Sequence, residues 1–169
     1  MPALEYPDTA TLPEDLRKAL ATHQANVYRM VAHSRGMAVS FLSMADAMLQ
    51  TNSMPMALRE LAILRVGHAY GSRYELHHHE RFARAVGLGD TAIEAAGTGV
   101  TRGLSEQEVA VIRWTDRLLA EHTLDGADRD HAVEMLSVTG FADFVLTVGF
   151  YQLVCNFLNT FEVDTAGEA

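Results

Sequence analysis

The hydrophobic residues of this chain recur with helical spacing, and no stretch alternates apolar and polar residues for long enough to predict a strand. The four prolines all lie before residue 56, so none interrupts a helix in the rest of the chain. The pattern therefore predicts an all-helical fold. The predicted helices span about residues 13–33, 37–50, 53–69, 73–86, 90–97, 105–121, 127–137 and 141–161.

Short polar patterns mark where several of these helices begin. Ser72 with Glu75, and Ser105 with Glu108, have the spacing of a capping box, in which two side chains bind the first turn of a helix. Ser53 is expected to cap the helix that follows it, because a serine hydroxyl accepts a hydrogen bond from the first free backbone N–H groups. These signals predict helix starts near residues 53, 72 and 105.

The helices are predicted to form a single domain overall. An N-terminal helical arm, residues 1–52, precedes a core that spans residues 53–163, and the small acidic segment 164–169 is expected to be a disordered tail. The most apolar stretch, 141–161, contains Asp143, Gln152 and two asparagines, which would be costly in lipid. This stretch is therefore predicted to be a buried core helix.

The composition limits the classes of binding partner and the cellular compartment that we expect for this protein. The 169 residues carry a net charge of -9, which disfavours nucleic acid and an anionic membrane surface as partners. The chain has one cysteine, Cys155, so it can form neither an internal disulfide nor a CxxC redox pair. Its first residues do not have the pattern of a secretory signal, and with a single thiol this favours a cytoplasmic protein.

The candidate chemistry lies between residues 58 and 86. Glu60 is predicted to lie on a helix that is apolar nearly all round, so its carboxyl group is expected to be buried and able to hold or deliver a proton. On the next helix Glu75 and His79 lie one turn apart inside the apolar arc, below Ser72, whereas amphipathic design places charge outward. Departures of this kind concentrate at functional sites.

These residues suit proton transfer without a cofactor. His79 titrates near physiological pH, Glu75 can orient its imidazole, and Glu60 supplies a second proton carrier. Each residue also has a structural interpretation. Ser72 and Glu75 can simply form a capping box, His79 can be a satisfied core histidine, and Glu60 can pair with an arginine such as Arg59 or Arg65.

A metal centre is not predicted. The run His77–His78–His79 contains three ligand types in a row, but consecutive residues of a helix point about 100° apart and cannot converge on one ion. A zinc site of Glu60, Glu75 and His79 has suitable ligand types but lacks any HExxH or CxxC motif. We therefore expect neither a metal nor another cofactor.

Three segments together resemble the carboxymuconolactone decarboxylase family, the AhpD-like superfamily. They are LRELAILRV at 58–66, GSRYELHHH at 71–79 and AVGL at 85–88, and the likeness extends over about residues 25–163. The resemblance implies an all-helical, AhpD-like core that assembles as a homotrimer or homohexamer, with the active site near subunit contacts. Its peroxidase branch uses a glutamate, a CxxC pair and a histidine.

Carried over by position, the glutamate of that branch corresponds to Glu60 and the histidine to His79, whereas the two cysteines correspond to Ser72 and Glu75. Peroxidase chemistry is therefore not expected. The decarboxylase-like branch also lacks the pair and resembles this chain in its YExxxH pattern, from Tyr74 to His79. There the reaction is loss of carbon dioxide from a carboxylated lactone, followed by protonation of the enolate.

The sequence thus predicts a cofactor-free acid–base lyase or isomerase that acts on a small carboxylated or lactone-type molecule. His79, Glu75 and Glu60 are the predicted catalytic residues. The predicted substrate-binding residues are Ser72, Arg59, Arg73 and His78. Two alternatives stay open: an AhpD-type redox protein that uses Cys155 across a subunit contact, and a non-catalytic oligomeric binding protein.

Overall fold

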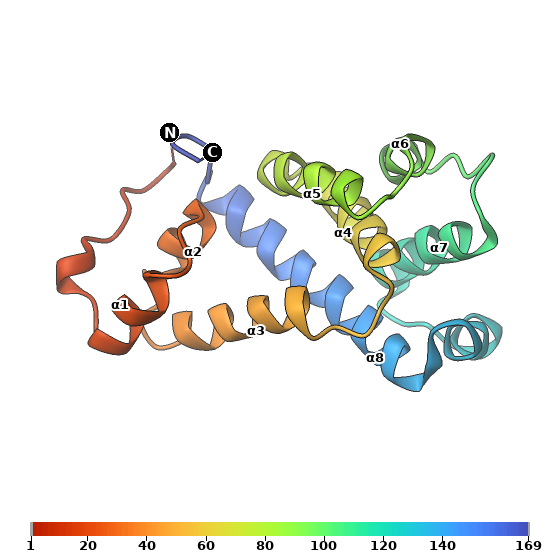
Figure 1. The fold of residues 1–169 in the computed structure, drawn as a ribbon, viewed down its shortest axis with the longest axis horizontal. Coiled ribbons are helices and arrows are strands. Elements are labelled where there is room, and N and C mark those ends of the chain that lie inside the picture. The colour runs from red at the N-terminus through yellow and green to blue at the C-terminus, as the bar shows by residue number, and fades with distance from the viewer. Residues whose placement is uncertain (1, 169) are drawn as a thin grey trace. The chain divides into compact units, whose positions relative to one another are not determined.

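In the computed structural model, which describes residues 2–168, the chain consists of α-helices joined by loops and one short 3₁₀ turn (Figure 1). No β-strand occurs among residues 2–168, so the predicted all-helical fold is confirmed over this range. The elements are η1 (Thr9–Thr11), α1 (Glu14–Leu20), α2 (Asn26–Val31), α3 (Ala38–Gln50), α4 (Met56–Tyr70), α5 (Arg73–Ala85), α6 (Asp90–Thr98), α7 (Glu106–Glu121) and α8 (Gly126–Thr160).

The prediction of one helix over residues 13–33 is wrong, since the structure divides this stretch into α1 and α2. The helix ends after Leu20, where the Thr22 hydroxyl and the His23 ring both bind the carbonyl oxygen of Ala19, at 3.2 and 2.7 Å. Side-chain bonds of this kind compete with the backbone bonds that would continue a helix. The polar residues between α1 and α2 therefore break the segment.

Of the three serines predicted to cap helices, one is confirmed and two are wrong. The Ser105–Glu108 capping box of α7 is confirmed, with Ser105 as the N-cap residue. Ser53 does not cap α4, because its hydroxyl donates instead to Asp143 at 2.6 Å. The Ser72–Glu75 box is also wrong: Ser72 makes no side-chain capping bond at α5.

The helices predicted at 127–137 and 141–161 belong to one element, α8, which is broken at a single residue. Ser137 has φ 66° and ψ 169°, a backbone conformation outside the helical region. Its hydroxyl accepts a hydrogen bond from the backbone N–H of Gly140 at 3.3 Å and so caps the second half of α8. The predicted division is therefore present as a kink.

Residues 53–156 form one of two compact units, which we call the core unit. α4 is its central helix and packs against α5, α6 and α7. Its hydrophobic core combines residues of α4, α7 and α8, among them Leu61, Leu64, Val66, Val111, Trp114, Phe144 and Val148. Because α4 is surrounded on nearly every side, even its polar residues Arg59 and Glu60 are buried.

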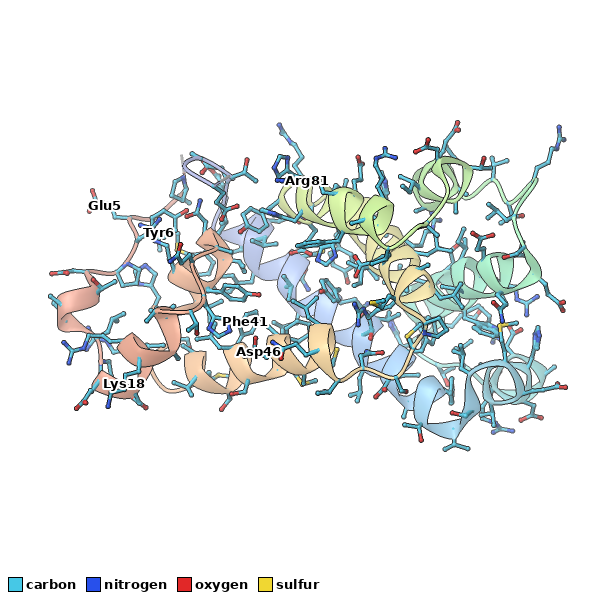
Figure 2. The ribbon with its side chains drawn as sticks, viewed as in Figure 1. Glu5, Tyr6, Lys18, Phe41, Asp46 and Arg81 are labelled. Atoms are coloured by element: carbon cyan, nitrogen blue, oxygen red, sulfur yellow. The ribbon has the colours of Figure 1, made fainter. Side chains whose placement is uncertain are left out.

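Residues 1–52 and 157–169 form the other compact unit, the arm unit, of which the structure describes 2–52 and 157–168. Here α1 and α2 pack against α3, the helix that carries Asp46 (Figure 2). The His23 ring contacts the Asp46 carboxylate at 3.0 Å. The Asn26 side-chain amide donates to the carbonyl oxygens of Asp164 and Ala166, at 2.9 and 3.0 Å. These bonds hold part of the segment 164–169, whose last residue lies outside the described range.

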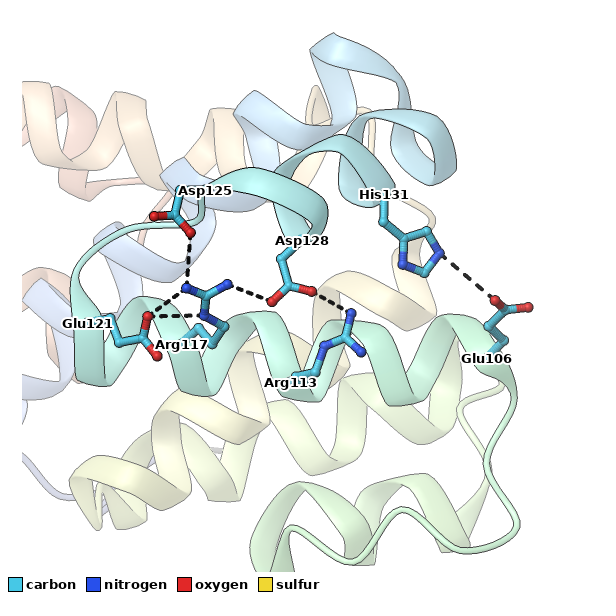
Figure 3. A network of polar contacts seen from close by, with 7 residues as sticks. All are labelled: Glu106, Arg113, Arg117, Glu121, Asp125, Asp128 and His131. Atoms are coloured by element: carbon cyan, nitrogen blue, oxygen red, sulfur yellow. Dashed lines mark hydrogen bonds and ion pairs between the residues drawn. The ribbon is translucent and has the colours of Figure 1, made fainter.

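The surface of the core unit carries a network of ion pairs where α7 meets the start of α8 (Figure 3). Arg117 contacts Glu121, Asp125 and Asp128, at 2.6, 3.2 and 2.7 Å, and Arg113 also reaches Asp128 at 2.6 Å. We call this cluster the surface charge network. It joins α7 to the loop and first turn that follow it.

α8 is long and apolar enough to cross a membrane by length and composition, a test that core helices of soluble proteins also pass. Within the core unit one side of α8 is buried, including Phe144, Val148 and Cys155. The other side is exposed at Leu146 and Leu153, so the helix predicted to be buried in the core is buried on one side only.

Candidate functional site

Two adjacent polar residues enter the core from α4. Glu60 is 1% exposed and Arg59 is 5% exposed, and Arg59 Nε lies 3.6 Å from Glu60 Oε1. Of the two arginines considered as partners for Glu60, Arg65 pairs instead with Asp116, at 2.6 and 3.2 Å. Glu60 therefore has one arginine beside it and an oxygen left for another partner.

α5 supplies that partner. Glu75 and His79 lie one helical turn apart on its buried side, whereas Arg73 and His77 are exposed. The helical spacing thus places both buried groups toward α4, which packs against α5.

The imidazole of His79 bridges two carboxylates. Its Nδ1 lies 2.6 Å from Glu60 Oε2, and its Nε2 lies 3.2 Å from Glu75 Oε2. Arg59, Glu60, His79 and Glu75 thus form a row of alternating charge, which we call the buried charge network. It joins residues of α4 and α5 that are 15 to 20 positions apart in the sequence.

These contacts determine the protonation of His79. Burial alone lowers the pKa of the imidazole, but the hydrogen bonds and charges of Glu60 and Glu75 outweigh burial and raise this pKa to about 9. At neutral pH His79 is therefore an imidazolium, which donates a hydrogen bond from Nδ1 to Glu60 and forms an ion pair with Glu75 through Nε2. With Arg59 as the second cation, the two positive charges balance those of the two carboxylates.

The same geometry bears on metal binding. An imidazole that carries a proton on each nitrogen has no lone pair left for an ion. Among residues 2–168, no group of three His, Cys, Asp or Glu side chains is arranged to hold a metal ion.

Two aromatic rings surround the His79 imidazole. Tyr151 from α8 stands edge-on with its ring centroid 5.0 Å away, and Phe82 from α5 lies at 5.6 Å. Tyr151 is buried, whereas Phe82 is 49% exposed. Phe82 therefore connects the buried charge network to the protein surface.

The single thiol of the chain lies next to this site. Cys155 on α8 is buried, and burial together with the charge of Glu75 raises the pKa of its thiol to about 12, against a smaller lowering by the Ser72 hydroxyl. The thiol is therefore protonated at neutral pH and a poor nucleophile.

Residues 37–117 match the carboxymuconolactone decarboxylase family. The matching segment covers just under half of the chain. The fold of the chain is similar to that of an uncharacterized peroxidase-related protein from Ralstonia eutropha JMP134, described as an alkylhydroperoxidase AhpD core, with a TM-score of 0.81 and 20% sequence identity. The match covers 99% of this chain and 93% of the other. The comparison with curated proteins finds no match.

The resemblance seen in the sequence is thus confirmed, and the AhpD-like fold with it. Glu60, Ser72, Glu75 and His79 all lie in the segment that matches the carboxymuconolactone decarboxylase family. Cys155 lies outside that segment, on α8.

The structure gathers some of the predicted site residues and separates others. Glu60, Glu75 and His79 are in contact, and Arg59 joins them through Glu60. Ser72 is buried beside Cys155.

The two other predicted substrate-binding residues do not join this group. Arg73 is exposed, and the ring of His78 packs on Tyr74 at 4.6 Å. Sequence reasoning missed Tyr151 and Phe82 as neighbours of His79. For Phe82 the i, i+3 spacing from His79 was an available signal, whereas for Tyr151, 72 positions away, the sequence offered none.

Proposed function

We propose that this chain, whose residues 37–117 match the carboxymuconolactone decarboxylase family, is a cofactor-free acid–base enzyme, a lyase or isomerase that acts on a small carboxylated or lactone-type substrate. The observation that carries the proposal is the His79 imidazolium held between Glu60 and Glu75. A buried cation whose proton is shared with two carboxylates is suited to deliver that proton to a carbanion-like intermediate.

In the decarboxylation that we propose, the bond between the substrate carbon and its carboxylate breaks and carbon dioxide leaves. The electron pair stays on the substrate as an enolate conjugated with the lactone carbonyl. The Nε2–H bond of His79 then breaks, and its proton forms a new C–H bond at the enolate carbon. His79 recovers a proton from water, so that the cycle consumes one proton and releases one carbon dioxide.

The two carboxylates have different parts in this proposal. Glu60 makes the shorter contact, at 2.6 Å to Nδ1, and so fixes the ring orientation and stabilises the cation. Glu75 lies farther from Nε2, at 3.2 Å, and gives way when the substrate takes that position. We therefore assign the orientation of the His79 imidazole to Glu60, whereas the sequence analysis predicted this role for Glu75.

The redox alternative has less support. The positions that correspond to the two redox cysteines are Ser72 and Glu75, and the one thiol present, Cys155, is buried with a raised pKa. A non-catalytic binding protein is the second candidate. It is favoured by the 7% exposure of His79 and by the mutual pairing of its charges.

Carbon dioxide release from a panel of carboxylated lactones, with carboxymuconolactone first, tests the proposal. We expect His79→Gln to lower kcat/KM by about 10²- to 10⁴-fold, the usual contribution of a general acid. His77→Gln is the matched control, because His77 is exposed on the same helix. Turnover by His79→Gln at the wild-type rate contradicts the proposal, and a wild-type protein that turns over no member of the panel favours the binding protein.

A further inference from the structure

The His79 imidazole is buried, but one of the side chains around it is not. Three of its neighbours are buried as well, namely Glu60, Glu75 and Tyr151. The fourth is Phe82, which is half exposed and whose ring centroid lies 5.6 Å from that of His79. All of these residues belong to the core unit. Of the four neighbours, Phe82 is therefore the one that stands between the imidazole and water.

The position of Phe82 on α5 explains why its ring covers His79. A long side chain on an α-helix points back toward the N-terminus and covers the turn that precedes its own Cα. Phe82 comes three residues after His79, so its ring lies over the turn that carries the imidazole. The two rings meet edge-on, with 69° between their planes. Rings in this arrangement attract each other weakly, so the contact favours the covered state by an amount that thermal motion can overcome.

Phe82 differs in character from the exposed residues beside it. Arg81 and Arg84 are charged, and Phe82 is the one large apolar residue that is exposed on α5. A phenylalanine on a helix has two low-energy χ1 rotamers, and an exposed side chain changes between rotamers rapidly. With half of its surface in water, the Phe82 side chain is free to make such a change.

We propose that Phe82 is a gate that determines which molecules reach His79. In one rotamer its ring covers the imidazole, as in this structure, and in the other it turns into water and leaves room for a substrate beside Nε2. The size of the side chain at position 82 then limits the size of the substrate. The inference rests on the proposed function for the class of substrate, but the movement of the ring can be measured without any substrate.

Exchange of the His79 imidazolium N–H protons with water tests the gate in the ligand-free chain. A proton–nitrogen NMR spectrum of the full chain, isotope-labelled at histidine and tryptophan, measures this exchange at pH 7. We expect Phe82→Ala to speed it by about three- to tenfold, the range that one aromatic contact contributes. Phe82→Trp should slow it, because a larger ring covers more of the imidazole. Leu146→Ala is the matched control, since Leu146 is equally exposed on α8 of the core unit and its loss should not change the rate.

Trp114 distinguishes an open gate from an open core in the same spectrum. It is the single tryptophan of the chain and is fully buried in the core unit, so exchange of its indole N–H reports opening of the core. This rate should be the same in the wild type and in Phe82→Ala. If the His79 and Trp114 protons both exchange faster by the same factor, Phe82 contributes to the stability of the core and the gate is contradicted.

Turnover of the panel of carboxylated lactones tests the effect on specificity. Phe82→Ala should raise kcat/KM for panel members with a bulky ring substituent by about tenfold relative to the unsubstituted members, because the shorter side chain leaves room for the substituent. The same preference in the wild type and in Phe82→Ala would overturn the role of Phe82 in specificity.

The two experiments separate the gate from the proposed function. A His79 exchange rate that neither Phe82→Ala nor Phe82→Trp changes would overturn the gate, even if the chain decarboxylates a lactone. Exchange that follows the size of residue 82, in a chain that turns over no member of the panel, would support the gate and count against the proposed function alone.

Discussion

The surface charge network around Arg117 and the buried charge network around His79 both alternate cations with carboxylates, but they differ in their contact with water. In the surface charge network the side chains of Glu121 and Asp125 are 52% and 71% exposed. In the buried charge network the side chains of Glu60 and His79 are 2% and 8% exposed. Water can replace a lost partner in the first network and cannot easily do so in the second.

The number of partners differs as well. Arg117 contacts three carboxylates, so the loss of any one leaves two. Each nitrogen of His79 has one carboxylate beside it, so the loss of Glu60 leaves the buried Nδ1–H without its acceptor, and the loss of Glu75 removes the second negative charge next to the buried imidazolium. The comparison indicates that the surface charge network has more ion-pair partners than it needs. In the buried charge network, by contrast, each charged group depends on the others.

The largest expected effect is that of removing one buried charge. Glu60→Gln leaves Arg59 and His79 with a single carboxylate, and we expect it to lower the free energy of unfolding by about 3–5 kcal/mol. Urea denaturation at pH 7 measures the change. Glu121→Gln in the surface charge network is the control and should have no measurable effect. Equal losses from the two variants would contradict the distinction between the networks.

The pH dependence of stability should come mainly from His79. Its pKa is raised from 6.5 to about 9 in the folded chain, so its contribution is fully present below pH 6.5 and is lost as the pH rises through 9. The size of the shift corresponds to roughly 3 kcal/mol. Urea midpoints measured from pH 6 to 9.5 should fall in the wild type and stay flatter in His79→Gln, and parallel curves would contradict this assignment.

The buried charge network shows which features of the site could be predicted from the sequence. Glu60, Glu75 and His79 were found from helical spacing alone, because a charged residue inside an apolar arc is visible in the pattern. The same pattern could not show which oxygen meets which nitrogen, nor that Glu75 turns to His79 rather than to the backbone near Ser72. Those choices depend on packing between α4 and α5.

The fold shows the same limit. Most predicted helices exist, since their apolar stripes are long, but the break between α1 and α2 depends on side-chain bonds from Thr22 and His23 to one carbonyl group. The approach of Tyr151 to His79 joins residues 72 positions apart. Contacts of this kind are set by the tertiary fold, and no local pattern predicts them.

Cys155 gives a test of intermediate size. Because burial and the charge of Glu75 raise the pKa of its thiol to about 12, we expect the native chain to react with a disulfide reagent at pH 8 about 100-fold more slowly than the chain in urea. Absorbance of the released thiolate measures both rates. If the native thiol reacts as fast as the thiol in urea, the result would contradict the packing around Cys155 and would support the redox alternative.

The smallest effect is expected at the edge of the surface charge network. Asp125→Asn removes the most exposed of the three acidic partners of Arg117, whose guanidinium keeps Glu121 and Asp128. We expect at most a slight fall in the urea midpoint in low salt. That fall should vanish in 1 M NaCl, where electrostatic screening acts over about 3 Å. A large loss that salt does not reduce would show that Asp125 acts through the fold of the α7–α8 loop, and that the surface network is as interdependent as the buried one.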